Sequence, residues 1–142
     1  MALIMPGAIW DPAPAWKQGY GLYPSPQNKE GFVIHSMVGS FTAARSRLMG
    51  TDTASWCFSV PKAGPCYQHF DPYAVTWHCG GPGDANPLSV AIGNVALIGL
   101  ELEGGPIGNV SELWTPNQFD RVLDILVWCY SVIPTLKYPS RI

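Results

Sequence analysis

Histidine and carboxylate side chains stand at the ends of two predicted strands in this sequence, where side chains can carry chemistry. His35 ends the apolar run GFVIHS, whose length and Phe, Val and Ile content predict a short buried strand. A histidine at such a strand end can be packing filler, a hydrogen-bonding group or a metal ligand. For an isolated histidine a hydrogen bond to a neighbouring carbonyl is the simpler interpretation, so the rest of the chain must distinguish these roles.

Two carboxylates follow the most apolar run of the chain. Strand alternation in NVALIGLELEGG places Glu101 and Glu103 on one face of a predicted strand. The segment ALIGL before Glu101 indicates a buried strand at the sheet centre, where an unpaired carboxylate would be costly. Glu101 is therefore a candidate functional group rather than a solvated carboxylate on the exposed face of an edge strand. Glu103 lies farther along and is expected at the rim.

The four cysteines, Cys57, Cys66, Cys79 and Cys129, contain no C-x-x-C pair, so a cysteine-based zinc knuckle is not expected. Cys57 and Cys66 flank a predicted hairpin and could lie near each other. Their pairing cannot be read from sequence, and free buried thiols are the simpler interpretation. A cysteine hydrolase that uses Cys57 or Cys79 with a histidine stays open as an alternative.

The helices and strands that position these side chains are predicted to form a single α/β domain, with a central mixed β-sheet flanked by helices. Ser40 caps a short helix that Gly50 ends. Thr115 and Gln118 form a capping box at the start of a long helix, which Pro134 ends. The predicted strands are residues 31–36, two arms of a hairpin within 55–70, and a strand within 94–105.

The first thirty residues are rich in Pro, Gly and aromatic side chains and show no clear period. We expect residues 1–30 to be an irregular lead-in that packs Trp10 and Trp16 onto the domain formed by residues 31–142. The last segment, LKYPSRI, begins like a new strand. In the long helix, helical spacing predicts one buried stripe, made of Phe119, Val122, Leu123, Leu126 and Tyr130.

Composition excludes several classes of function. The 142 residues carry a formal net charge of −2 and no run of Lys or Arg, so a nucleic-acid partner is not expected. The apolar stretches are too short or too interrupted to cross a membrane. The N-terminus has no basic region of the secretory type, which leaves the compartment open. We expect a monomer.

Four fragments occur here in one order, and together they are more specific than any one alone: FVIHS, SWCFSV with YQHF and AVTWHCGG, IGLELEG, and TPNQFDRVLDILVW. Between Gly31 and Ile133 the chain resembles the zinc N-acetylmuramoyl-L-alanine amidases of bacteria and phages, which share a fold with the peptidoglycan recognition proteins. The resemblance implies that His35 is a zinc ligand and that Glu101 is the general base. It also implies a substrate, peptidoglycan, cleaved between muramic acid and L-alanine.

The resemblance also bears on the aromatic residues. His78 in TWHCGG matches a turn that lines the family's cleft without binding zinc, and we expect His78, Trp77 and Trp56 to contact substrate. Trp56 stands where some phage members have a catalytic tyrosine. An indole only donates a hydrogen bond, so Glu101 is left as the sole base candidate. His69 is expected to be structural or near the cleft.

The family's other two zinc ligands, and a lysine that polarises the substrate carbonyl, follow the long helix. This sequence ends at KYPSRI, with no His, Asp or Cys after Cys129. We therefore expect a C-terminally truncated amidase domain whose remaining zinc ligands lie beyond Ile142, and a 142-residue chain that binds zinc poorly and is inactive. His35, His78 and Cys79 are not expected to form a ligand set, because neighbouring residues seldom converge on one ion.

Two other hypotheses remain. A non-catalytic recognition module would hold muropeptide in the same groove, and Trp56, Trp77 and His78 would then matter while Glu101 would not. A soluble α/β domain with a structural His35 is the third possibility. For an amidase, the lack of a clear signal peptide and of a wall-binding repeat favours a phage-encoded lysin over a secreted bacterial enzyme acting at the cell wall.

Overall fold

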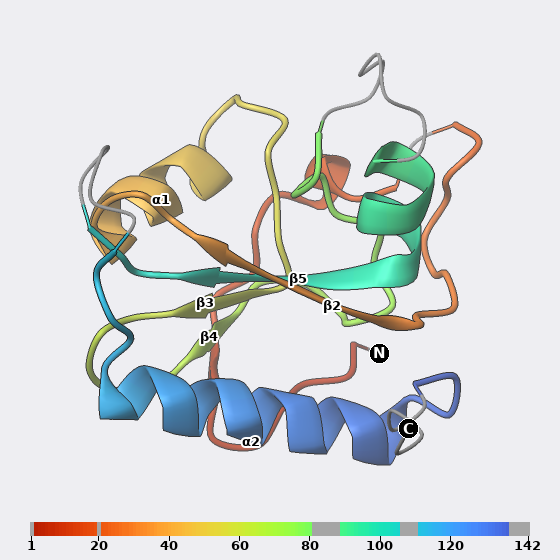
Figure 1. Ribbon diagram of the computed structural model, residues 1–142. Coiled ribbons are helices and arrows are strands. Elements are labelled where there is room, and N and C mark those ends of the chain that lie inside the picture. The colour runs from red at the N-terminus through yellow and green to blue at the C-terminus, as the bar shows by residue number, and fades with distance from the viewer. Residues whose placement is uncertain (1, 20, 81–88, 106–110, 137–142) are drawn as a thin grey trace.

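Five short strands form one mixed sheet in the order β1-β4-β3-β5-β2 (Figure 1). The computed structural model describes residues 2–19, 21–80, 89–105 and 111–136. β3 and β4 are antiparallel, and the other neighbouring strands are parallel. The mixed α/β domain predicted from the sequence is confirmed. The strands are β1 (Ile9–Trp10), β2 (Gly31–Ser36), β3 (Phe58–Val60), β4 (Tyr67–Gln68) and β5 (Leu97–Leu102).

The two strands that carry His35 and Glu101 run side by side. β2 has the predicted limits and pairs with β5 along all six residues, with His35 opposite Glu101. β5 has a partner on each side, β2 and β3, as expected of a central strand. β2 pairs with β5 alone in the described part of the chain, and Ile34 is 38% exposed, so the prediction of a buried strand is wrong.

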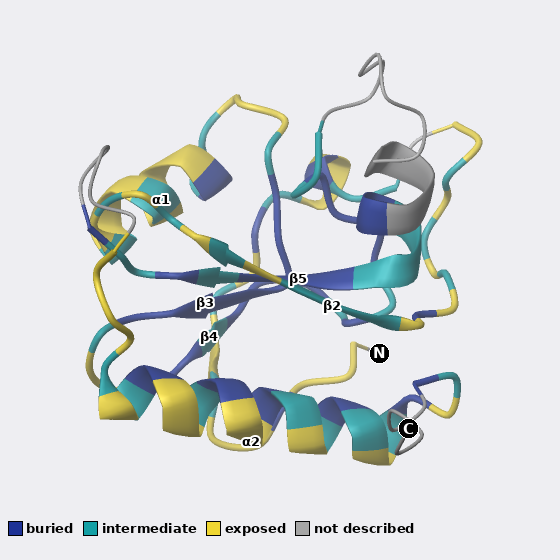
Figure 2. Cartoon of the chain, viewed as in Figure 1, coloured by how far each residue is buried: buried dark blue, intermediate teal, exposed yellow. Residues whose placement is uncertain are grey.

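Helices cover both faces of the sheet (Figure 1). The long helix α2 (Pro116–Val132) lies on one face, and the short α1 (Phe41–Met49) lies on the other with a π-helix, η2 (Ser89–Ala96). The side of α2 that faces the sheet is buried and its outer side is exposed (Figure 2). In the described residues no helix is long and apolar enough to cross a membrane.

Both predicted helix starts are confirmed by their caps. The Ser40 hydroxyl accepts a hydrogen bond from the amide of Ala43, and Gly50 follows the last residue of α1. At α2 the Thr115 hydroxyl accepts from the amide of Gln118, whose side chain accepts in turn from the amide of Thr115. These side chains satisfy amide groups that a helix start leaves without a partner.

The buried stripe of α2 differs from the predicted one. Phe119 is 58% exposed and Leu123 is 60% exposed. The Gln118 side chain donates to the carbonyl oxygens of Val60 and Glu103, which turns this residue toward the sheet and its neighbour Phe119 outward. The residues that α2 buries are Gln118, Val122, Ile125 and Cys129.

The N-terminal segment is more ordered than predicted. β1 extends the sheet beside β4, and a 3-10 turn, η1 (Ala15–Lys17), follows it. Trp10 is 37% exposed and Trp16 is 57% exposed, so the prediction that they pack onto the domain is wrong. Lys17 is buried instead, because its ammonium donates to the carbonyl oxygens of Arg47 and Ala54.

One sequence prediction falls mostly outside the described residues. The strand expected to begin in LKYPSRI involves residues 137–142. The division of the chain at residue 30 stays a prediction.

Candidate active site

Three side chains stand in a row across the sheet, on the face opposite α2. Ser59 of β3, Glu101 of β5 and His35 of β2 are register partners, so their side chains project to the same side. The preceding residues, Phe58 and Leu100, project to the other side, where Phe58 contacts the ring of Trp128 in α2. Alternation along the strands thus separates an apolar core face from a polar face under α1 and η2.

A pocket of about 220 Å³ opens on this polar face. It gathers four of the five side chains predicted for the site, while His35 reaches it through its contact with His78. A larger hollow of about 590 Å³ lies elsewhere and contains one carboxylate, that of Glu30, with no partner group for catalysis. The residues that line the small pocket are Arg47, Asp52, Thr53, Ala54, Trp56, Trp77, His78, Gly80 and Glu101.

Glu101 is the carboxylate at the wall of this pocket. Burial raises the pKa of Glu101 to about 7, and the positive charge of Arg47 acts in the opposite direction. A carboxyl group with a pKa near neutral pH can both accept and release a proton under ordinary conditions, which is what acid–base catalysis needs.

His35, His78 and Cys79 converge beside Glu101, contrary to the sequence-based expectation. Nε2 of His35 lies 3.1 Å from Nδ1 of His78, and Sγ of Cys79 lies 3.7 Å from the first nitrogen and 3.2 Å from the second. His35 approaches from β2, and the side chains of His78 and Cys79, which lie in a bend, both face it. Two imidazole nitrogens and a thiol sulfur are donors that zinc prefers, so the group fits this ion chemically.

The charge state of both imidazoles suits such a role. Burial lowers the pKa of His35, and burial together with the neighbouring His35 lowers the pKa of His78 to about 3. Both rings are then neutral at pH 7, as metal binding requires. Burial raises the pKa of the Cys79 thiol, and the charge of Glu101 raises it further.

A series of buried hydrogen bonds holds the side chain of Trp56 in the wall of the pocket. The Trp56 indole donates to the Ser59 hydroxyl over 2.8 Å, and that hydroxyl lies 2.9 Å from Nε2 of His69. Nδ1 of His69 is 2.8 Å from the carbonyl oxygen of Asp11, which can only accept, so Nδ1 carries the proton and Nε2 accepts from Ser59. Burial lowers the pKa of His69 to about 4, in keeping with this neutral ring.

The comparisons with known proteins agree with this architecture. The sequence profile of the N-acetylmuramoyl-L-alanine amidase family matches residues 25–133. The chain belongs to this family. No curated protein matched the sequence.

Solved structures show the same amidase fold. A structure of PlyL superimposes with a TM-score of 0.64 at 15% identity, covering 89% of this chain and 74% of PlyL. The endolysin amidase LysCS from Clostridium intestinale URNW gives 0.60 at 19%, covering 94% and 81%. A selenomethionine derivative of AmpD gives 0.63 at 14%, covering 94% and 79%.

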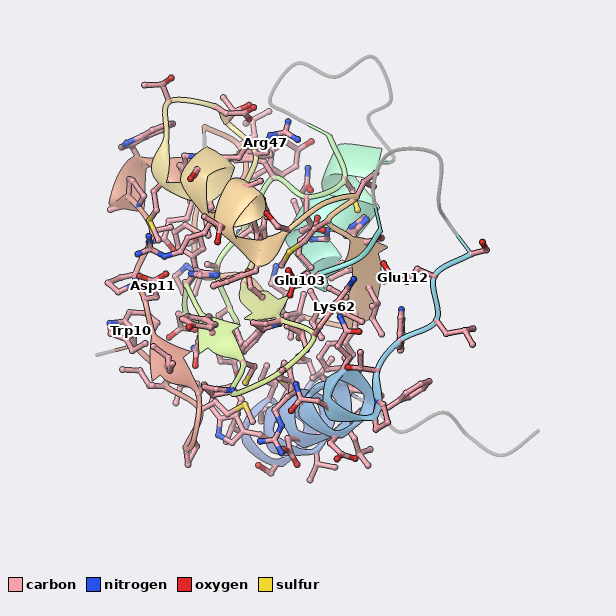
Figure 3. The ribbon with its side chains drawn as sticks, turned by 90° about the vertical axis from the view of Figure 1, so that its left-hand side faces the viewer. Trp10, Asp11, Arg47, Lys62, Glu103 and Glu112 are labelled. Carbon is pink, nitrogen blue, oxygen red and sulfur yellow. The ribbon has the colours of Figure 1, made fainter. Side chains whose placement is uncertain are left out.

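The sequence predicted Glu103 at the rim of the site, but the structure of this amidase domain does not place it there. Its carboxylate accepts hydrogen bonds from the amides of Phe41, at the start of α1, and Lys62, in the hairpin loop. Figure 3 shows Glu103 beside Lys62, whose ammonium pairs with Glu112. Glu103 therefore joins β5 to α1 and to the hairpin, a structural role that strand alternation alone could not indicate.

The four cysteines of the amidase domain are free, as the simpler interpretation predicted. Cys57 and Cys66 are both buried, and no disulfide joins them. Burial raises the pKa of Cys57 to about 11, which keeps its thiol protonated and poorly nucleophilic near pH 7. Cys79 is the only partly exposed thiol, and its neighbours are the two imidazoles described above.

Proposed function

We propose that this protein is a zinc-dependent N-acetylmuramoyl-L-alanine amidase that hydrolyses the amide bond between the lactyl group of muramic acid and L-alanine in peptidoglycan. Family membership supports the reaction class. The observation that carries the proposal is the position of Glu101, a carboxyl group with a pKa of about 7 at the wall of a pocket, directly across the strand pair from His35.

The chain's own residues supply the acid–base part of this reaction. Glu101 in its ionised form takes a proton from the water that attacks the lactyl carbonyl carbon, and a carbon–oxygen bond forms. When the carbon–nitrogen bond breaks, Glu101 returns that proton to the departing amine of L-alanine. Zinc, held at His35 with His78 and Cys79 beside it, would supply positive charge that polarises the carbonyl.

The two tryptophans support a role for the same pocket in holding the substrate. Trp56 and Trp77 line it, and each is only 4% exposed, so each presents a small, fixed apolar edge rather than a mobile ring. The hydrogen bond from Trp56 to Ser59 sets the tilt of this indole. His78 contributes a polar group to the same wall. A rigid wall of this kind orients the muropeptide so that the reacting amide lies at Glu101.

The proposed substrate places the protein at the cell wall, as a phage-encoded lysin or a secreted bacterial enzyme. One of the similar structures is itself named an endolysin amidase. We propose that the protein acts as a monomer, since the side chains assigned above all come from one chain and lie in or beside one pocket.

The product of digestion tests the proposal. Purified peptidoglycan is incubated with the zinc-supplied protein, and the soluble fraction is analysed by mass spectrometry. The proposal predicts free peptides that begin with the amino group of L-alanine, together with glycan strands of unchanged length.

Three other results would contradict it. Protein that sediments with peptidoglycan and releases nothing would identify a recognition module. New reducing ends would identify a glycosidase, and peptides cut at other bonds would identify a peptidase.

A further inference from the structure

We propose that this chain holds its zinc with three ligands of its own: Nε2 of His35, Nδ1 of His78 and Sγ of Cys79. The inference rests on the proposed function in taking zinc as the metal. It goes beyond that function because it assigns the two ligands that the family resemblance would place after the long helix. It also replaces the expectation that the 142-residue chain binds zinc poorly.

The spacing of the three atoms is that of a tetrahedral site. Bond lengths of about 2.0–2.1 Å to nitrogen and ~2.3 Å to sulfur give tetrahedron edges of about 3.3 Å between two nitrogens and ~3.5 Å between nitrogen and sulfur. The observed edges are 3.1 Å for nitrogen to nitrogen, and 3.2 and 3.7 Å for sulfur to nitrogen. Each observed edge lies within about 0.4 Å of the ideal value, so small side-chain rotations suffice to complete the geometry.

The imidazole of His78 is held in the tautomer that a ligand needs. Its Nε2 lies 3.4 Å from the carbonyl oxygen of Leu97, which can only accept, so the proton is on Nε2. The lone pair of Nδ1 then points at Nε2 of His35 and Sγ of Cys79. A backbone carbonyl behind a ligating histidine is a usual outer-shell partner in metal sites.

Two glycines make room for the adjacent ligands. A Cβ atom at Gly99 would stand 2.6 Å from the ring of His78, and one at Gly93 would stand 2.4 Å from Cβ and 2.7 Å from Sγ of Cys79. Such contacts are far inside the van der Waals limit. Any larger residue at either position would push one ligand out of the group.

Asn94 fixes the backbone that carries Cys79. The amide of Cys79 donates to Oδ1 of Asn94 over 2.7 Å, and Nδ2 of Asn94 donates to the carbonyl oxygen of Gly80 over 2.8 Å. Asn94 is itself fully buried, and its own carbonyl accepts from the buried ammonium of Lys29. The position of Cys79 is therefore set before any metal arrives, which lowers the cost of binding.

Three protein ligands leave the fourth tetrahedral position open, as in catalytic zinc sites rather than structural ones. Glu101 is the cross-strand partner of His35, and it shares the pocket wall with His78. The proposed ligand set therefore lies beside the proposed general base, and one site serves both roles.

Cobalt spectroscopy on the full 142-residue chain tests the ligand set independently of activity. Co²⁺ substitutes for zinc and absorbs visibly in a tetrahedral site, and a thiolate ligand adds a sulfur-to-cobalt charge-transfer band in the near ultraviolet. We expect both signals at one Co²⁺ per chain, and we expect one equivalent of Zn²⁺ to remove both. Absence of the charge-transfer band in the wild-type chain would overturn the proposal.

Variants assign the signals to residues. Cys79→Ala should abolish the charge-transfer band, whereas the matched thiol control Cys66→Ala should keep it. His78→Ala should weaken zinc binding by at least about 100-fold, since loss of an outer-shell partner alone typically costs 10–100-fold. Circular dichroism verifies that each variant is folded. A folded Cys79→Ala or His78→Ala protein with wild-type zinc affinity would overturn the proposal.

The outcomes separate this inference from the proposed function. A chain that shows the cobalt signals but releases no peptides from peptidoglycan would support the ligand set and contradict the amidase function. A chain that releases L-alanine peptides, and whose zinc affinity is unaffected by Cys79→Ala, would support the amidase function and contradict the ligand set.

Discussion

At the scale of single residues, Glu101 is the side chain on which catalysis depends in this account. Glu101→Gln removes the proton acceptor and keeps nearly the same shape. We expect kcat for release of L-alanine peptides to fall by roughly 10²–10⁴-fold, the usual contribution of a positioned acid–base group, with little change in KM. The exposed carboxylate Glu30 provides the matched control, Glu30→Gln. A Glu101→Gln enzyme as active as this control would show that Glu101 does not act in the mechanism.

His69 predicts a pH dependence of stability. Its pKa is about 4 in the folded protein and ~6.5 when unfolded, so the unfolded state binds the proton more readily between these values. The contribution of the neutral ring is complete above about pH 6.5 and is lost as the pH falls toward 4, by up to ~3 kcal/mol.

Urea unfolding of wild type and His69→Gln across this range measures the effect. His35 and His78 titrate in both proteins, so the difference between the two curves isolates His69. We expect the free energy of unfolding of the wild type to fall more steeply with decreasing pH than that of the variant. Parallel curves would contradict the assignment of His69 as a buried neutral histidine.

The residue scale also shows what sequence could and could not indicate. His35 and Glu101 are candidates because each stands in a short apolar strand, and the family resemblance implies a role for each. The convergence of His78 and Cys79 on His35 was missed, because it depends on close contacts with Gly93 and Gly99. A glycine inside an apolar strand is a signal for such a close approach, and Gly99 carried that signal.

At the scale of elements, Gln118 sets the orientation of α2. Its amide group donates to the carbonyl oxygens of Val60 and Glu103, and its oxygen accepts from the amide of Thr115. Gln118→Ala leaves these buried groups without their partner, at a cost of about 2–4 kcal/mol. Asp120→Ala, at an exposed position of the same helix, should change stability by less than about 0.5 kcal/mol.

Urea unfolding distinguishes the two variants. Equal midpoints for Gln118→Ala and Asp120→Ala would show that the side-chain contacts of Gln118 do not hold the helix against the sheet. A lower unfolding midpoint for Gln118→Ala alone would also explain why the buried stripe of α2 differs from the predicted one. Apolar periodicity favours Phe119 and Leu123, but the polar contacts of Gln118 decide which side of α2 faces inward.

Element limits were predictable where local side chains determine them. Ser40, Thr115 and Gln118 place both helix starts, because the capping bonds are local and visible in sequence. The role of Lys17 was not predictable, since its ammonium meets carbonyl oxygens of residues thirty or more positions away. The same contacts leave Trp16 on the surface, although its size and hydrophobicity favoured burial.

At the scale of the whole molecule, zinc should stabilise the fold. The three proposed ligands come from β2 and from the segment that follows Trp77, so binding joins parts of the chain that lie far apart in sequence. A ligand at 100 times its Kd adds about 2.7 kcal/mol to the stability of the state that binds it. For a domain of this size that corresponds to a rise in Tm of roughly 8 °C.

Differential scanning calorimetry with and without zinc measures this rise. Cys79→Ala should show a much smaller shift than the wild type, and magnesium should shift neither protein, because it prefers oxygen ligands. An equal zinc-dependent shift in wild type and Cys79→Ala would place the ion elsewhere in the molecule.

The mixed α/β class follows from local patterns that the sequence displays, whereas the order of the strands does not. The site depends on contacts between segments that are distant in sequence. The pairing of β2 with β5 brings His35 to Glu101, and the segment after Trp77 brings His78 and Cys79 beside both. The sequence predicted both strands but neither their pairing nor the position of His78 and Cys79, because both depend on contacts between segments far apart in the chain.

X-ray absorption at the zinc edge tests the central claim most directly, since it counts the atoms bound to the ion in the zinc-loaded 142-residue chain. The account predicts one sulfur at about 2.3 Å and three nitrogen or oxygen atoms at ~2.0–2.1 Å, with the sulfur contribution lost in Cys79→Ala. A first shell of nitrogen and oxygen alone in the wild-type protein, or a spectrum unchanged by Cys79→Ala, would contradict it.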